Sequence, residues 1–269
     1  MAPKHALLGL LAVSSREVVK FAHQTGRLVS AVVRPALWLL VFAAGFQNVF
    51  GVSIIPPYET YIRYEVYVVP GLLGMVLLFN GMQSSLSMVY DREMGVMRLL
   101  LTAPLPRWYL LLCKLVAGTL LSVLQAYAFL LLCALFRVEL PWAGWLSALP
   151  ALWLAGMMLG AVGLLLSVHI RQLENFAGTM NFVIFPMFFV SSALYPLWKV
   201  QESGAEVVYQ LARLNPFTHA VELIRFALYG QLNLVAAAVV ATFFLVCFAL
   251  ASLGYDPQRG LMGRVQRPA

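Results

Sequence analysis

Charged side chains are scarce in this chain of 269 residues, in which Asp, Glu, Lys and Arg together make up 11%. Apolar residues make up 62%, well above the half that is typical of a soluble domain. Several stretches of about 20 residues carry almost no charge, and a helix of that length crosses the hydrocarbon core of a bilayer. The composition therefore excludes an ordinary soluble domain and predicts an all-α membrane protein.

Cysteine is also rare, and its positions are uninformative about chemistry. Cys113, Cys133 and Cys247 lie in or beside apolar runs and show no paired spacing. Disulfide frameworks and metal sites usually bring cysteines in pairs at short spacing, so we interpret these three as small packing residues.

The common catalytic motifs are absent. The chain contains no G-x-x-x-x-G-K-[ST] phosphate-binding loop, no HExxH and no G-x-S-x-G. We therefore predict no catalytic, cofactor-binding or metal site and no nucleotide hydrolysis by this chain. His219 and Glu222 are three residues apart and leave an enzymatic alternative open, although no third ligand lies near them in the sequence.

Six apolar runs predict six transmembrane helices, at residues 31–50, 67–89, 108–136, 143–168, 176–195 and 232–254. Residues 5–28 combine a leucine-rich side with a basic side, which is typical of a helix that lies in the membrane interface. The predicted organisation is an N-terminal interfacial segment over 1–30, a six-span domain over 31–254 and a tail over 255–269.

Lysines and arginines are divided unequally between the two sides that six spans define. Five lie on the side opposite to the termini, namely Arg63, Arg137, Lys199, Arg213 and Arg225. Thirteen lie on the side of the termini, namely Lys4, Arg16, Lys20, Arg27, Arg34, Arg92, Arg98, Arg107, Lys114, Arg171, Arg259, Arg264 and Arg267. Because cytoplasmic loops carry the excess of Lys and Arg, both termini are predicted to be cytoplasmic. The net charge of +7 then reflects topology and not a nucleic-acid partner.

The most charged internal segment lies between the second and third predicted spans. Asp91 and Glu93 stand where a short helix would begin, and Pro104 stands where it would end. We predict a cytosolic helix over residues 91–104, with an apolar stripe that fits a groove on another protein. The residues predicted to contact that partner are Asp91, Glu93, Met94, Met97, Arg98, Leu100 and Leu101.

A second semi-polar stretch, residues 196–230, precedes the last apolar run. Asn215 and Pro216 predict a helix start, with Asn at the N-cap and Pro at the first helical position. Glu222 and Arg225 lie on this helix, whose length of about 15 residues is too short to cross the bilayer. We predict external re-entrant helices here, marked by these four residues.

Apart from Arg34 and Lys114, which we count on the side of the termini, the polar residues that we place inside the spans are uncharged, which argues against a proton or ion relay. Those that could line a substrate path are Asn80, Gln83, Ser84, Asn181, Ser191 and Ser192. The alternative, that they join helices by hydrogen bonds as the small residues Gly156 and Gly160 join them by close contact, stays open.

Three motifs follow one another along the chain: DREMGVMRLLLTAPLPRWYLLLCK (91–114), SSALYP (191–196) and LNPFTHAVELIRFALYG (214–230). The first is similar to the E-x-G-x-x-x-x-L-x-x-P-L-x-R coupling segment of ABC-2 type permeases, and the third to the Asn-Pro helix before their last span. Nearly the whole chain resembles this family of bacterial ABC exporter transmembrane subunits. Within the family it is similar to nodulation-factor and drug-efflux permeases, and to permeases beside quinoprotein alcohol-oxidation genes.

The resemblance implies that residues 91–104 form a coupling helix, residues 5–28 a connecting helix and residues 196–230 the external re-entrant helices. It implies two copies of this chain, as a homodimer in the bacterial inner membrane, with two copies of a cytosolic ABC ATP-binding subunit. That subunit would bind ATP and Mg²⁺, and this chain would hold no cofactor. The implied function is outward transport of an amphipathic, lipid-linked or drug-like substrate.

Two further alternatives stay open beside the enzymatic one. The chain could anchor a regulatory ATPase without transporting anything, because the cytosolic contact would look the same. It could also be a stand-alone secondary transporter, although membrane carboxylates and repeated halves, which such proteins use, are not visible in the sequence.

Overall fold

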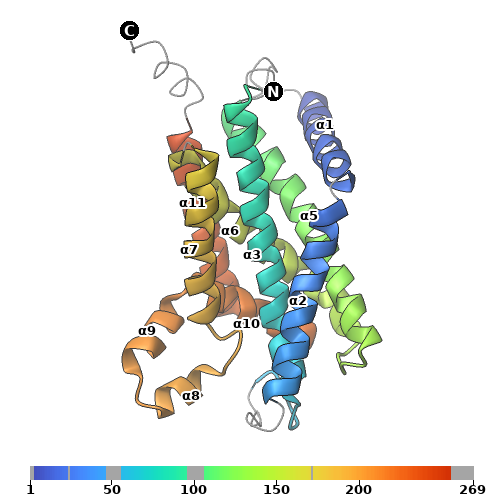
Figure 1. Cartoon of the computed structure of the whole chain (residues 1–269), viewed down its shortest axis with the longest axis vertical. Coiled ribbons are helices and arrows are strands. Elements are labelled where there is room, and N and C mark those ends of the chain that lie inside the picture. Colours follow the sequence, from blue (N-terminus) through green and yellow to red (C-terminus); the bar gives the residue numbers. More distant parts are fainter. Residues whose placement is uncertain (1–2, 24, 47–55, 96–105, 171, 256–269) are drawn as a thin grey trace.

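The computed structural model describes residues 3–23, 25–46, 56–95, 106–170 and 172–255. Within these ranges every regular element is an α-helix, and no strand occurs. The helices, labelled in Figure 1, are α1 (Pro3–Ala22), α2 (Thr25–Phe46), α3 (Tyr64–Glu93), α5 (Arg107–Leu135), α6 (Ala143–His169), α7 (Leu173–Phe189), α8 (Leu197–Glu202), α9 (Glu206–Leu214), α10 (Pro216–Leu228) and α11 (Leu234–Gly254).

In the part of the chain that the structure describes, four helices are long and apolar enough to cross a membrane, namely α3, α5, α6 and α11. They correspond to four of the six predicted spans and confirm an α-helical membrane protein. The predicted span 176–195 is a shorter helix, α7, whose 17 residues rise by only about 26 Å. The chain leaves α7 at Val190, where the Ser191 hydroxyl accepts the backbone N–H of Ala193. The number of six spans therefore stays a prediction.

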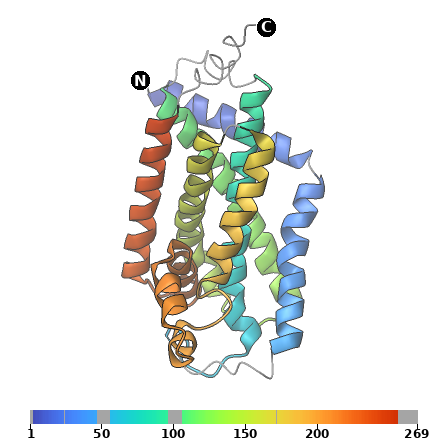
Figure 2. The same ribbon diagram turned by 60° about the vertical axis from the view of Figure 1, so that its left-hand side comes forward.

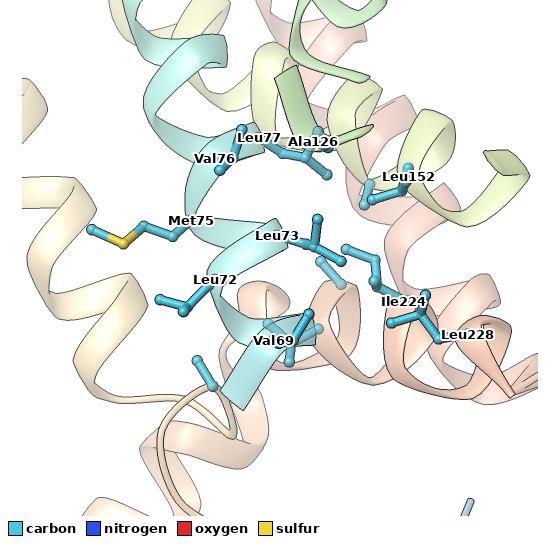
Figure 3. Close-up of a cluster of buried hydrophobic side chains, with 14 of the residues drawn as sticks. Val69, Leu72, Leu73, Met75, Val76, Leu77, Ala126, Leu152, Ile224 and Leu228 are labelled. Atoms are coloured by element: carbon cyan, nitrogen blue, oxygen red, sulfur yellow. The ribbon is translucent and has the colours of Figure 1, made fainter. Parts of the chain in front are cut away.

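Helix α3 is the centre of the bundle and contacts α2, α5, α6, α7 and α10 (Figure 1). Of its apolar stretch, 89% is buried inside the protein, whereas only 22% of the apolar stretch of α11 is buried. Figure 3 shows α3 side chains such as Leu73 and Leu77 packing against Leu152 of α6 and Ile224 of α10. A helix that is apolar on all sides is usually buried in a core or in a membrane. Helix α3 is enclosed by protein, whereas α11 leaves most of its surface available to lipid.

Small residues let α3 and α6 approach closely. A Cβ added to Gly81 of α3 would lie 3.0 Å from backbone atoms of Gly160 in α6. A Cβ added to Gly156, one turn earlier in α6, would lie 3.0 Å from the side chain of Thr119 in α5, so the predicted small-residue pair lies on two different helix contacts. Lipid supplies no hydrophobic driving force between apolar helices. Van der Waals contact between closely spaced backbones therefore stabilises this packing.

The two ends of the bundle carry different elements. Helix α1 lies across one end, the upper end in Figures 1 and 2, whereas α8, α9 and α10 lie at the lower end. Helix α11 ends at the same end of the bundle as α1. This is shown by Tyr255, just beyond α11, which packs with Met88 and Leu111. We name the two ends after their buried charges, the Asp91 end and the Arg225 end. The predicted broken helices of 196–230 are α8, α9 and α10 at the Arg225 end.

Replacing Gly81 by alanine should destabilise the bundle, because the new Cβ would meet the backbone of α6, which cannot rotate away. Overpacking of a tight contact costs about 1–3 kcal/mol. Gly178→Ala in α7 is the matched control, since no atom lies within 4 Å of a Cβ there. Thermal unfolding in detergent should give a lower Tm for G81A only, and equal Tm values for the two variants would contradict the close contact.

Candidate functional site

Asp91 is a buried carboxylate, 2% exposed, in the last turn of α3. The Lys114 ammonium of α5 lies 2.7 Å from its Oδ2 atom. From α1, Arg16 and Lys20 reach its Oδ1 atom at 3.4 and 3.5 Å. A buried charge without a partner would cost several kcal/mol, so these cations make the buried position of Asp91 tolerable. One carboxylate thereby joins α1, α3 and α5.

Helix α1 is held at this end by further contacts. Lys20 donates a hydrogen bond to the Ser87 hydroxyl at 2.8 Å, and its ammonium lies 5.8 Å from the centre of the Tyr90 ring. Val13 and Phe21 are buried. The apolar side chains that α1 leaves exposed are Leu7, Leu8, Leu11, Val18 and Val19. The helix therefore has one face on the bundle and an apolar face turned outward, which suits the amphipathic pattern in its sequence.

The next two residues of α3 hold the junction between α6 and α7. Arg92 donates to the carbonyl oxygens of Ser167 and Ile170 at the C-terminal end of α6, at 3.0 and 2.7 Å. Glu93 accepts the backbone N–H of Leu173, the first residue of α7, at 3.1 Å. A cation at a helix C-terminus and an anion at a helix N-terminus both complement the helix dipole. Three consecutive residues thus connect the end of α3 to four other helices.

The segment predicted to meet a partner begins at this junction. Asp91 and Glu93 belong to the last turn of α3, which extends beyond residue 89 because the charge of Asp91 is neutralised by neighbouring helices. Met94 is 60% exposed in the turn that follows, and Gly95 has a φ of +75°. The other predicted contact residues lie outside the described residues, namely Met97, Arg98, Leu100 and Leu101.

A second buried charge lies at the other end of the bundle. Arg225 of α10 is 3% exposed, pairs through Nη1 with Glu222, and donates through Nη2 to the Ser192 carbonyl at 2.9 Å. Its guanidinium carbon lies 4.2 Å from the centre of the Tyr67 ring of α3. The Ser192 hydroxyl donates to the Glu222 carboxylate at 2.7 Å. The cluster joins α3, α10 and the turn that follows α7.

Burial and charge shift the pKa values of two groups in this cluster. Burial by itself would lower the pKa of the Arg225 guanidinium, but the adjacent Glu222 carboxylate outweighs it and raises that pKa above the usual value. Burial raises the pKa of Tyr58, whose ring lies edge-on against Tyr229 with centres 5.0 Å apart. The site therefore combines a buried guanidinium with one adjacent carboxylate and several tyrosine side chains.

Helix α10 begins as its sequence predicts. Asn215 is the N-cap, its side-chain oxygen accepts the backbone N–H of Phe217 at 3.0 Å, and Pro216 is the first helical residue. The Asn215 amide nitrogen also donates to the carbonyl oxygens of Met187 and Val190 at 2.8 and 2.6 Å. The Asn215 side chain thus forms hydrogen bonds with a backbone N–H at the start of α10 and with backbone carbonyls at the end of α7.

The residues proposed for a substrate path are not gathered in one place. Asn80 is buried and donates to Gln125 of α5. Ser191 is buried and donates to the Phe188 carbonyl at 2.6 Å, and Ser192 belongs to the Arg225 cluster. These three side chains make hydrogen bonds within the protein.

The remaining three path residues have different surroundings. Ser84 lines a cavity of about 20 Å³ between α3, α5 and α6, which has room for about one water molecule. Gln83 is half-buried and lies near Arg34 of α2. Asn181 lies exposed on the outer surface of α7, beside the exposed ring of Phe182.

The sequence patterns alone did not identify the cations that surround Asp91. Lys114 carried a usable signal, because a lysine at the eighth residue of an apolar helix needs an anion nearby. Arg16 and Lys20 carried none, since basic residues on an interfacial helix normally face headgroups.

The residues of the enzymatic alternative have separate partners. The Nε2 atom of His219 lies 3.1 Å from the carbonyl oxygen of Arg213, whereas Glu222 pairs with Arg225. Within the described ranges no group of three or more His, Cys, Asp or Glu residues could hold a metal ion.

Comparison with known proteins gives one family. The sequence model of the ABC-2 type transporter family matches residues 9–229. The chain is 26% identical over 220 residues to a putative transport permease, ycf38, of Cyanophora paradoxa, covering 81% of this chain and 73% of that protein. It is 24% identical over 243 residues to the daunorubicin resistance ABC transporter permease protein DrrB1 of Streptomyces coeruleorubidus, covering 85% and 80%. A probable multidrug ABC transporter permease of Escherichia coli, YbhR, is 27% identical over 169 residues, covering 62% and 44%.

Replacing Asp91 by asparagine should loosen α1, because the Lys114 ammonium and the two α1 cations lose their shared anion. Removing one partner of a buried pair costs on the order of 3 kcal/mol. Hydrogen exchange should show faster exchange of the α1 amides, together with a lower Tm in detergent. Adding Lys114→Met should recover part of the Tm, since Lys114 is the most buried of the three cations. Unchanged α1 exchange in D91N would show that Asp91 does not hold this helix.

Proposed function

The chain belongs to the ABC-2 type transporter family, and from this premise we propose that it is the membrane permease subunit of an ATP-driven exporter. The observation that carries the proposal is the junction at the end of α3. There Asp91, Arg92 and Glu93 fasten α3 to α1, α5, α6 and α7, immediately before the segment that the family resemblance identifies as the coupling helix. A force applied to that segment would reach most of the bundle at once.

The proposed topology has six spans with both termini in the cytoplasm of the bacterial inner membrane. It is supported by the position of α1 and the end of α11 at the same end of the bundle, which requires an even number of crossings. The Asp91 end then faces the cytoplasm, in agreement with the excess of Lys and Arg on that side. The helices α8, α9 and α10 would lie at the outer leaflet as re-entrant helices.

The partners follow from the same reading. Two copies of this chain would pair with two copies of a cytosolic ABC ATP-binding subunit, which would bind ATP and Mg²⁺. The contact would be made by the apolar stripe of residues 91–104, with Met94 already exposed at its start. A short helix that inserts apolar side chains into a groove is a common mode of protein recognition.

Helix α3 provides the mechanical link in the proposed mechanism. At the Asp91 end it receives the movement of the coupling segment. At the Arg225 end its Tyr64 and Tyr67 hydroxyls donate to the carbonyl oxygens of Leu194 and Ser192, at 2.6 and 2.9 Å. A rigid, protein-enclosed helix that is bonded at both ends would shift the external helices when its inner end moves, and so alternate access to the two sides.

The substrate class and the direction of transport rest on the relatives and on surface chemistry. One relative is named for daunorubicin resistance and another as a probable multidrug permease. The outer surface of α7 exposes aromatic rings, Phe182 and Phe185, together with the amide of Asn181. These features support an amphipathic, drug-like or lipid-linked substrate that moves outward.

Replacing Met97 and Leu100 together by aspartate should abolish binding of the ATP-binding subunit, because each buried apolar anchor is worth roughly 1.5–3 kcal/mol. The matched control is Val207→Asp with Leu211→Asp, two exposed apolar residues of α9 at the opposite end. Co-expression with the ATP-binding subunit and affinity purification should recover the complex from the control and not from M97D/L100D. Equal recovery from both would reject residues 91–104 as the contact.

Replacing Arg92 and Glu93 together by glutamine should uncouple the two subunits without separating them. The helix-end contacts to α6 and α7 would be weakened while the apolar stripe stays intact. The rate of transport by proteoliposomes should fall on the order of tenfold, which corresponds to a typical coupling free energy between two sites. The ATP-binding subunit should remain bound. The control is Glu206→Gln with Arg213→Gln, an exposed acid and arginine on α9. Full transport by R92Q/E93Q would contradict the role of the α3 junction.

A further inference from the structure

The turn between α5 and α6 forms a groove that the proposed transport mechanism does not use. The groove has a volume of about 480 Å³, within the range of small-molecule sites. It lies at the Arg225 end of the bundle, at the lower right of Figure 1 and away from α8 and α9. The lining residues that matter for its chemistry are Arg137, Glu139, Leu140, Trp142 and Trp145.

The groove lies where two membrane-spanning helices reach the membrane surface, because α5 ends at Leu135 and α6 begins at Ala143. Trp142 is 72% exposed, and its ring stacks on that of Trp145 with centres 5.0 Å apart. Tryptophan side chains concentrate at the level of the lipid headgroups. Exposed leucines continue along both helices from the groove into the hydrocarbon region, namely Leu131, Leu135, Leu146 and Leu149.

Both signs of charge stand at this surface. Within the described part of the chain the Arg137 guanidinium makes no hydrogen bond or ion pair. The Glu139 carboxylate is highly exposed and lies 3.7 Å from Arg63, which is closer to Glu65 at 3.1 Å. An exposed pair at that distance contributes little, so Glu139 is free to exchange Arg63 for a ligand cation.

The backbone at Arg137 is a second, independent feature. Arg137 has a φ of +59°, and its N–H bonds to the Ala134 carbonyl while the N–H of Val138 bonds to the Cys133 carbonyl. This is a Schellman turn, in which glycine normally occupies the left-handed position. The other described residues with positive φ are all glycines. An arginine at such a position costs backbone strain, and strain of this kind often accompanies a functional side chain.

We propose that the groove binds the headgroup of a zwitterionic phospholipid that carries a primary ammonium. The planar Arg137 guanidinium would hold the phosphate through charge-assisted hydrogen bonds. The Glu139 carboxylate would accept N–H hydrogen bonds from the ammonium. The faces of the stacked tryptophan rings lie nearby and also attract cations. The acyl chains would lie along the exposed leucines. The proposal requires only that α5 and α6 cross the membrane, and does not depend on the proposed transport.

Charge complementarity favours this occupant over the other common lipids. An anionic headgroup without an ammonium would place a second negative charge beside Glu139. A choline headgroup could lie against the tryptophan rings but has no N–H to donate to Glu139. Free phosphate would engage Arg137 alone and leave the leucine surface uncovered.

The test is a lipid titration of the full-length protein in detergent, followed by native mass spectrometry and by Tm. The probes are phosphatidylethanolamine, phosphatidylcholine, phosphatidylglycerol and inorganic phosphate. Arg137→Gly is the informative variant, because glycine adopts the same positive φ without strain and the fold is retained. The matched control is Arg213→Ala, which removes an exposed arginine of α9 at the same end.

The proposal predicts that phosphatidylethanolamine binds the wild-type protein and R213A at least tenfold more tightly than R137G, and raises the Tm of the first two only. Glu139→Gln should reduce the preference for phosphatidylethanolamine over phosphatidylglycerol. Equal lipid affinity of R137G and wild type would overturn the proposal. Stabilisation of the protein by inorganic phosphate to the same extent as by the lipid would overturn it too. So would a cross-link between two copies of the chain through Trp142→Cys, because a second copy would then cover the groove.

Discussion

A charge buried among membrane helices must be neutralised by an opposite charge and by hydrogen bonds, and this constraint organises both ends of the bundle. Asp91 can stay in the last turn of α3 only because Lys114, Lys20 and Arg16 converge on it. Arg225 can stay in α10 only because Glu222 and the Ser192 carbonyl receive it. Each buried charge therefore determines which elements of the bundle come into contact and at which position along their length.

Helix α3 extends between these two ends of the bundle, and 89% of its apolar stretch is buried inside the protein. The close approach of Gly81 to Gly160 and the packing of Leu73 and Leu77 enclose α3 along its length (Figure 3). Helix α11, by contrast, leaves most of its apolar surface free. This difference gives the molecule a stiff centre with a lipid-facing periphery, an arrangement that can transmit a movement from one membrane surface to the other.

Much of the fold was predictable because hydrophobic length and helix punctuation act locally. The runs 67–89, 108–136, 143–168 and 232–254 appear as α3, α5, α6 and α11. The start of α10 was predictable because Asn215 caps its own helix and Pro216 fits the first turn. The end of α7 was not, because its closure depends on Asn215 reaching back from another helix to the Met187 and Val190 carbonyls.

The sequence by itself determined that this is a helical membrane protein of the ABC-2 type, and that its charge is concentrated before the third span. Those properties follow from composition, segment length and residue order. Only the tertiary structure decided what each polar residue does: that Asp91 holds α1, that Arg92 and Glu93 hold the ends of α6 and α7, and that Ser192 binds Glu222. The physical reason is that a hydrogen bond or ion pair is a property of two groups, and in each of these cases the second group lies far away in the chain.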